Sequence, residues 1–131
     1  MAFVLLDSTV LIDLLRGRAG ALGRLHDLRS AHDIPATSVV NIEEIVRGLH
    51  RREEDVSRGL LTGLRLAPLG RTEGERAGRW RREFARRGTT LSQADCLIAA
   101  AAVGIGARLA TANLKDFPMR ELSLEHWPVG E

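Results

Sequence analysis

Short apolar runs alternate with longer amphipathic segments along this chain, and this alternation limits the available folds more than any other feature of the sequence. Residues Phe3 to Leu6 form an apolar run that predicts a strand ending at Asp7. Leucine and isoleucine then recur at helical spacing after Ser8, which can cap a helix there. Strands that alternate with helices pair in parallel through right-handed crossovers, so the sequence predicts an α/β sandwich with a mainly parallel sheet.

The same alternation continues along the rest of the chain. The further helices expected from apolar spacing cover residues 19–32, 42–49, 53–65, 72–87 and 92–104. Further strands are expected at 34–38, 107–111 and 122–124, while 66–69 is either a strand or a turn around Pro68. Ligands of such open sheets bind beyond the carboxyl ends of the strands, so polar residues expected there are the candidates for function.

Length and cysteine content narrow the class of protein. A chain of 131 residues can bury a core by itself, and we expect residues 1–131 to form a single domain. The only cysteine, Cys96, cannot form an internal disulfide, which favours a reducing compartment. The first residues lack the basic region of a signal peptide, and the longest apolar stretch, 97–105, is too short to span a bilayer. The sequence therefore predicts a cytoplasmic protein without a membrane partner.

Four acidic residues from four separate segments are expected at the carboxyl edge of the sheet: Asp7, Glu44, Asp95 and Asp116. Asn113 lies in the same loop as Asp116 and adds a neutral oxygen donor. Like charges gathered in this way repel one another unless cations sit among them. A set of oxygen ligands without histidine or cysteine points to Mg²⁺ or Mn²⁺, metals suited to phosphate chemistry.

Each acidic residue also has a structural explanation. Asp7 and Asp116 fit ordinary turns. Asn41 can cap the helix that carries Glu44, with Glu44 closing a capping box on the side opposite the apolar stripe of that helix. Asp95 stands three residues after a serine cap, yet it shares a face with residues expected to be buried. A buried carboxylate is stable beside a helix N-terminus and a bound cation, which favours the metal-site interpretation.

The positive charge of the chain comes almost entirely from arginine, with Lys115 as the single lysine. Seven arginines fall within residues 71–87, and Arg79, Arg82 and Arg86 are candidates for contacts with an RNA backbone. The alternative is that these arginines form an ordinary solvated helix face.

Three other residues are expected to have structural roles. Trp80 and Trp127 are interpreted as packing anchors, and Asp13 is interpreted as a surface charge on the first helix.

Four motifs occur in order along nearly the whole chain: Asp-Ser-Thr-Val-Leu-Ile at 7–12, Glu-Ile-Val-Arg-Gly at 44–48, Asp-Cys-Leu-Ile-Ala-Ala at 95–100 and Ala-Thr-Ala-Asn-Leu-Lys-Asp-Phe at 110–117. Together they resemble the PIN-domain family, and most closely the VapC-like toxins of bacterial toxin–antitoxin pairs. The resemblance implies a PIN-like three-layer α/β/α sandwich. It also implies a homodimer and an antitoxin that inserts part of its chain into the site, in a complex that can reach higher order.

The same resemblance assigns roles to individual residues. Asp7, Glu44, Asp95 and Asp116 would form the catalytic, metal-binding cluster, and Thr9 would support it. The chemistry expected is hydrolysis of RNA phosphodiesters assisted by divalent metal, with no protein nucleophile.

Two other classes of protein are compatible with parts of the pattern. A receiver-like phospho-acceptor domain needs a pair of acids after its first strand, whereas Asp7 is followed by Ser8 and Thr9. A PIN-like binding or regulatory module would lack turnover, and the presence of all four acids argues against it. Within the nucleases, the same metal chemistry also suits DNA.

Overall fold

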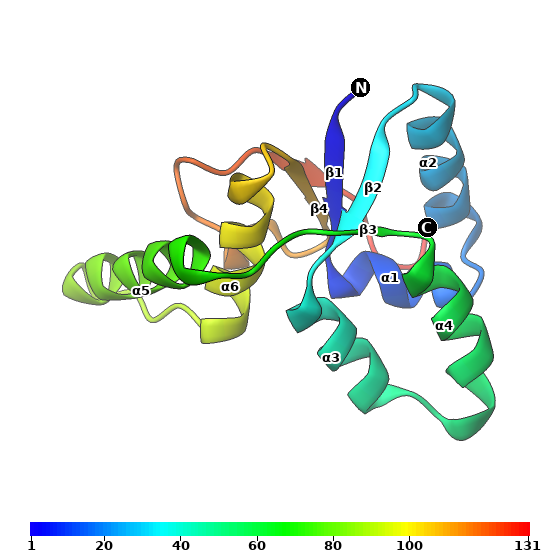
Figure 1. The fold of residues 1–131 in the computed structure, drawn as a ribbon, viewed down its shortest axis with the longest axis horizontal. Coiled ribbons are helices and arrows are strands. Elements are labelled where there is room, and N and C mark those ends of the chain that lie inside the picture. The colour runs from blue at the N-terminus through cyan, green and yellow to red at the C-terminus, as the bar shows by residue number, and fades with distance from the viewer.

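The computed structural model describes all residues from Met1 to Glu131, and a five-stranded sheet forms its centre (Figure 1). The strands are β1 (Phe3–Leu6), β2 (Ile34–Thr37), β3 (Arg65–Leu66), β4 (Arg108–Thr111) and β5 (Leu124–His126). Their order across the sheet is β3-β2-β1-β4-β5, and every neighbouring pair is parallel. All five carboxyl ends therefore lie at the same edge, as the sequence predicted.

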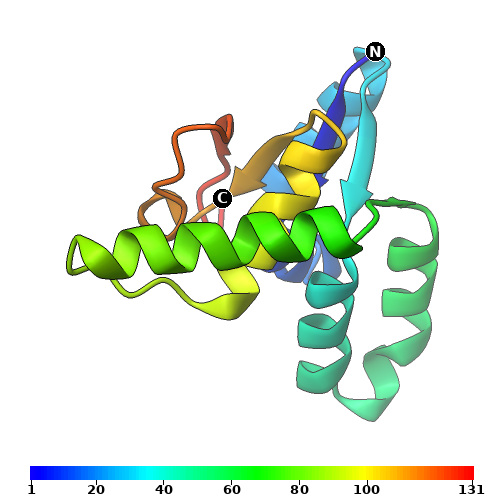
Figure 2. The ribbon, with the colours of Figure 1, turned by 60° about the vertical axis from the view of Figure 1, so that its left-hand side comes forward.

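Six α-helices and two short 3₁₀ helices surround the sheet. They are α1 (Ser8–Leu15), α2 (Ala19–Ser30), α3 (Val39–Gly48), η1 (Arg51–Glu53), α4 (Glu54–Thr62), α5 (Arg71–Arg86), α6 (Gln93–Gly104) and η2 (Leu114–Asp116). Both faces of the sheet are covered, which confirms the predicted three-layer α/β/α arrangement. Helices α3 and α4 lie side by side beyond the carboxyl edge of β2 (Figures 1 and 2).

The alternation of side chains along β1 explains the two cores. Val4 and Leu6 point to one face, where they pack with residues of α1 and α2, and Leu5 points to the other, where α5 and α6 pack. All three side chains are fully buried. Helix α5 crosses over α6 on the second face (Figure 2), and Trp80 is almost wholly covered there. A parallel sheet buried on both faces needs this continuous apolar sequence rather than an alternation of apolar and polar residues.

The serine cap of α6 was predicted correctly, but that of α3 was not. The backbone N–H of Asp95 donates to Ser92 Oγ at 3.0 Å, as the sequence predicted. Helix α3 begins one turn earlier than expected, because Ser38 is its cap and accepts the N–H of Asn41 at 3.3 Å. Asn41 is therefore inside the helix and is free to use its side chain for something else.

One expectation about burial needs correction. Asp13 is buried, with only 4% of its surface exposed, and Gly130 donates its N–H to Asp13 Oδ2 at 2.7 Å. The apolar stripe of α3 is only partly covered, since Ile45 is buried whereas Val46 is 55% exposed. The two tryptophans, by contrast, are each 4% exposed and act as the expected packing anchors. None of the helices combines the length and the apolar character needed to cross a bilayer.

Thr37, the last residue of β2, offers a test of the packing. Its side chain is 1% exposed, and its hydroxyl has no hydrogen-bond partner. Replacing Thr37 by valine keeps the shape and removes an unsatisfied buried polar group. We expect Thr37→Val to raise the free energy of unfolding by about 1 kcal/mol in urea titrations. A loss of stability would show that the hydroxyl has a partner in solution.

Candidate active site

Asp7 occupies the centre of the carboxyl edge, directly after β1. Its backbone N–H donates to the carbonyl of Ala110 in β4 at 3.0 Å, so the strand pairing continues up to this residue. The residue is buried, with only 6% of its surface exposed. Thr111 Oγ1 donates to Asp7 Oδ2 at 2.8 Å, and Asn41 Nδ2 donates to Oδ1 at 3.3 Å. Three elements of the fold thus converge on this carboxylate, namely β1, α3 and the end of β4.

Burial sets the electrostatic state of Asp7. It raises the pKa of the Asp7 carboxyl above the ordinary value, and the nearby charge of Glu44 raises it further. The hydrogen bonds from Thr111, from the backbone of Ser8 and from Thr9 act in the opposite direction, but burial outweighs them. The carboxylate is therefore held in place as an acceptor while its negative charge lacks a cationic partner.

Glu44 is fixed on α3 by a residue from α1. Ser8 Oγ donates to Glu44 Oε1 at 2.7 Å, and Glu44 itself is half-buried. Ser8 was expected to be a helix cap. Instead Asp7 occupies the cap position without a side-chain cap bond, which leaves the Ser8 hydroxyl available to Glu44.

Asp95 and Asp116 complete the acidic cluster from two other segments. Asp95 lies in the first turn of α6 and is half-buried, whereas Asp116 ends η2 and is exposed. Burial raises the pKa of the Asp95 carboxyl, and the charges of Asp116, Asp7 and Glu44 each raise it further. All four predicted acids thus lie within electrostatic range of one another.

The two supporting residues named from the sequence differ in their contacts. Thr9 Oγ1 donates to Asp7 Oδ2 at 3.4 Å and accepts the N–H of Ala112 at 3.1 Å, so it joins α1 to the loop after β4. Asn113 is exposed, and only its backbone N–H takes part, donating to Thr111 Oγ1 at 3.0 Å.

Sequence reasoning missed Ser8, Asn41 and Thr111 as members of this network. Thr111 could have been found, because it ends a strand next to β1 at the functional edge. The other two carry no such signal, since serine and asparagine near a helix start are normally interpreted as caps.

The donor set suits a hard divalent cation. None of the four acids takes part in an ion pair with arginine or lysine. No three of them converge closely enough to form a ready-made cage. Mg²⁺ commonly uses one or two carboxylates and keeps several waters, so an open group of oxygen ligands fits it better than a closed cage would.

The structure does not bring Arg79, Arg82 and Arg86 into the acidic cluster. All three are exposed on the face of α5 opposite Ala77 and Trp80, which pack against the rest of the molecule. Arg79 forms an exposed pair with Glu75 at 4.0 Å, while Arg82 and Arg86 have no ion-pair partner.

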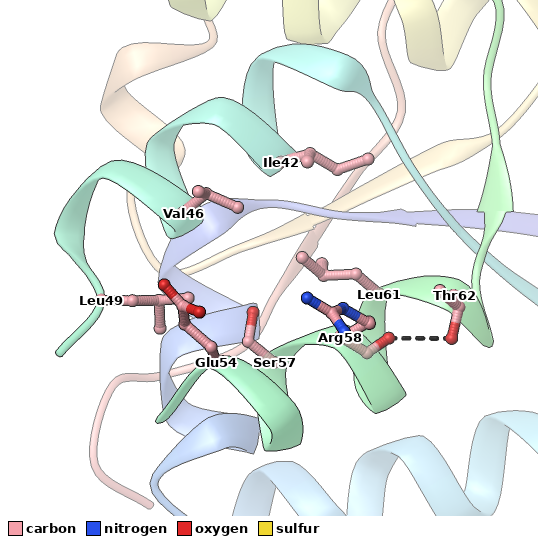
Figure 3. Close-up of a pocket in the computed structure, with 8 residues that line it drawn as sticks. All are labelled: Ile42, Val46, Leu49, Glu54, Ser57, Arg58, Leu61 and Thr62. Carbon is pink, nitrogen blue, oxygen red and sulfur yellow. Dashed lines mark hydrogen bonds between the residues drawn. The ribbon is translucent and has the colours of Figure 1, made fainter. Parts of the chain in front are cut away.

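A groove lies between α3 and α4 (Figure 3). It encloses about 390 Å³, and Ile42, Val46 and Leu49 from α3 face Leu61 from α4 across it. The rest of its lining is polar and comes from α4, namely Glu54, Ser57, Arg58 and Thr62. A second hollow of about 310 Å³ shares Leu49 with this groove and also includes Glu44. An apolar surface on α3 therefore continues towards one of the four acids.

Comparison with known proteins places this arrangement in a family. The model of the PIN domain matches residues 4–118. Ribonuclease VapC10 of Mycobacterium tuberculosis is 36% identical over 118 residues, which cover 90% of this chain and 88% of that protein. Among solved structures, DNA-bound VapBC from Salmonella typhimurium aligns with a TM-score of 0.84 at 23% identity, over 97% of this chain and 99% of that one.

A toxin–antitoxin complex from Klebsiella pneumoniae aligns with a TM-score of 0.73 at 26% identity, covering 91% of this chain and 94% of that one. The matched region includes all four acids of the cluster, and the fold agrees over nearly the whole length. The chain therefore belongs to the PIN-domain family and, within it, to the VapC-like proteins.

Proposed function

We propose that this chain is a divalent-metal-dependent endoribonuclease and the toxin of a toxin–antitoxin pair. Asp7, Glu44, Asp95 and Asp116 are its metal-binding and catalytic acids, with Mg²⁺ or Mn²⁺ as the ion. Divalent-metal dependence is the general property of PIN-domain VapC ribonucleases. The observation that carries the proposal is the buried Asp7 carboxylate, which is held by aimed donors, surrounded by three further acids and left without a cationic partner.

Residues of the chain have separate roles in the proposed hydrolysis. When bound, a divalent cation supplies Lewis-acid stabilisation of the negative charge on the phosphodiester. Thr111, Thr9 and Asn41 orient Asp7, and Ser8 orients Glu44. One of the four carboxylates can also take the proton of the attacking water.

The proposed partner is an antitoxin whose apolar segment occupies the groove between α3 and α4. Two of the structural relatives are a VapBC assembly and a toxin–antitoxin complex. The groove supports this assignment because its α3 side is apolar and is exposed at Val46, and because the hollow that shares Leu49 with it reaches Glu44. A homodimer completes the proposed assembly, and Val39, which is 48% exposed beside α6, offers it an apolar contact.

The main alternative is a PIN-like module that binds nucleic acid without cutting it, and a nuclease acting on DNA is a second. Incubation of antitoxin-free protein with total cellular RNA and with single-stranded DNA, in Mg²⁺, Mn²⁺ or EDTA, separates the three. Discrete RNA fragments that disappear with EDTA support the proposal. RNA that binds and stays intact in both metals supports the binding module.

Substitution of Asp7 tests the site and the electrostatics together. We expect Asp7→Asn to lower the rate of RNA cleavage by more than about 100-fold, because it removes a metal ligand. Asp27→Asn, which changes an exposed acid on α2, should leave the rate unchanged.

The same variant has a predicted stability profile in EDTA. Because burial raises the pKa of Asp7, the folded protein holds that proton more tightly than the unfolded chain does. The wild type therefore loses stability relative to Asp7→Asn as the pH rises from 3.8 through the raised pKa. Urea titrations at acidic and neutral pH measure this, and a difference that does not grow with pH would contradict it.

The arginine face of α5 is proposed to hold RNA phosphates away from the scissile bond. Single-stranded nucleic acid releases about 0.7 cations per phosphate contact, so Arg82→Gln with Arg86→Gln should reduce the slope of log affinity against log salt by roughly 1.4. Arg18→Gln with Arg29→Gln, two exposed arginines at α2, is the matched control. Equal slopes for both double variants would remove α5 from the RNA interface.

The groove is tested separately from catalysis. Val46→Asp places a charge on the apolar α3 side of the groove and should weaken inhibition by the coexpressed cognate antitoxin by more than about tenfold, since an apolar contact is lost and the carboxylate must be desolvated. RNA cleavage without antitoxin should be unchanged. Val56→Asp, at a 62% exposed position of α4 outside the groove, should leave inhibition intact. Normal inhibition of Val46→Asp would place the antitoxin elsewhere.

A further inference from the structure

Asn41 lies fully buried between two of the proposed metal ligands and touches no surface that substrate could reach. We propose that Asn41 is a positioning residue, which sets the relative placement of Asp7 and Glu44 for the divalent cation. This inference rests on the proposed function, because it concerns how the metal-binding acids are held.

The amide group of Asn41 connects the two acids through a continuous set of hydrogen bonds. Its Nδ2 donates to Asp7 Oδ1 at 3.3 Å and to Ser8 Oγ at 3.1 Å. Ser8 Oγ in turn donates to Glu44 Oε1 at 2.7 Å. The two N–H groups of one side chain therefore hold one acid directly and the other through a single hydroxyl.

The orientation of the amide is fixed from its other end. Ser38 Oγ donates to Asn41 Oδ1 at 2.6 Å, in a buried position. Rotating the amide by half a turn would place its carbonyl oxygen against the carboxylate of Asp7 and remove the Asn41 donor from both Asp7 Oδ1 and Ser8 Oγ. The Asp7 carboxylate can only accept, so the amide nitrogen faces it, and the Ser38 hydroxyl satisfies the amide oxygen on the other side.

The chemistry of the position requires an amide. Asn41 donates two hydrogen bonds through its amide nitrogen and accepts one through its amide oxygen. Leucine has nearly the same shape but no donor, so Asn41→Leu removes the connection without opening a cavity. Loss of a group that orients a metal ligand typically lowers metal affinity by 10–100-fold, although the group never touches the metal.

Calorimetric titration of the antitoxin-free protein with Mn²⁺ measures the proposed effect without relying on turnover. We expect Asn41→Leu to raise the dissociation constant for Mn²⁺ by about 10–100-fold. Ser8→Ala should raise it by a smaller factor, because it frees Glu44 but leaves Asp7 held. The double variant should lose less than the product of the two factors, since both changes break one network.

Thr37→Val is the matched control. Thr37 ends β2, one residue before Ser38, and its buried hydroxyl has no hydrogen-bond partner. The substitution removes that hydroxyl. The variant should bind Mn²⁺ and cleave RNA as the wild type does. Melting curves in EDTA report folding for every variant, so a change in metal affinity is separated from a loss of structure.

The outcomes distinguish a failure of the positioning role from a failure of the proposed function on which it rests. If the wild type and Thr37→Val bind Mn²⁺ and cut RNA, and Asn41→Leu binds Mn²⁺ equally well, the positioning role is wrong and the ribonuclease stands. If the wild type neither binds Mn²⁺ nor cuts RNA, the proposed function fails and the positioning role fails with it. Should Asn41→Leu not fold, Ser8→Ala decides, and wild-type affinity in that variant would overturn the proposal.

Discussion

The burial of one carboxylate at the end of the central strand is the constraint on which the rest of the site depends. Asp7 follows the strand that lies between β2 and β4, so its surroundings are built from both sides of the sheet. A buried negative charge is costly unless donors and cations compensate it. Thr111 and Asn41 provide donors from opposite sides, and the remaining acids create the demand for a cation. The position of Asp7 in the sheet therefore determines both its burial and its proposed role as a metal ligand.

Much of this arrangement follows from the sequence. The alternation of strands and helices predicts a parallel sheet, and the carboxyl ends of parallel strands lie at one edge of the sheet. That reasoning placed Asp7, Glu44, Asp95 and Asp116 at one edge without knowledge of their contacts. It could not assign Asn41, since Ser38 and Asn41 are both good caps and the choice depends on where α3 begins. It also could not foresee the exposure of Val46, because helical spacing identifies an apolar face but not what covers it.

Helix α3 has a role in both halves of the proposed biology. One side of it carries Glu44 and Asn41 in the acidic cluster, and another side lines the apolar groove with α4. A segment bound in the groove therefore lies against the helix that holds two residues of the site. Inhibition by a partner and retention of the metal would therefore both depend on the position of α3.

The strand order also determines when during synthesis the site can exist. Strand β1 and Asp7 are made first, but β4, Thr111 and Asp116 arrive only in the last quarter of the chain. A nascent chain that still lacks this part has a central strand with one unpaired edge and an incomplete set of acids. The acidic cluster and the donors that hold Asp7 can therefore assemble only after the C-terminal quarter of the chain has been made.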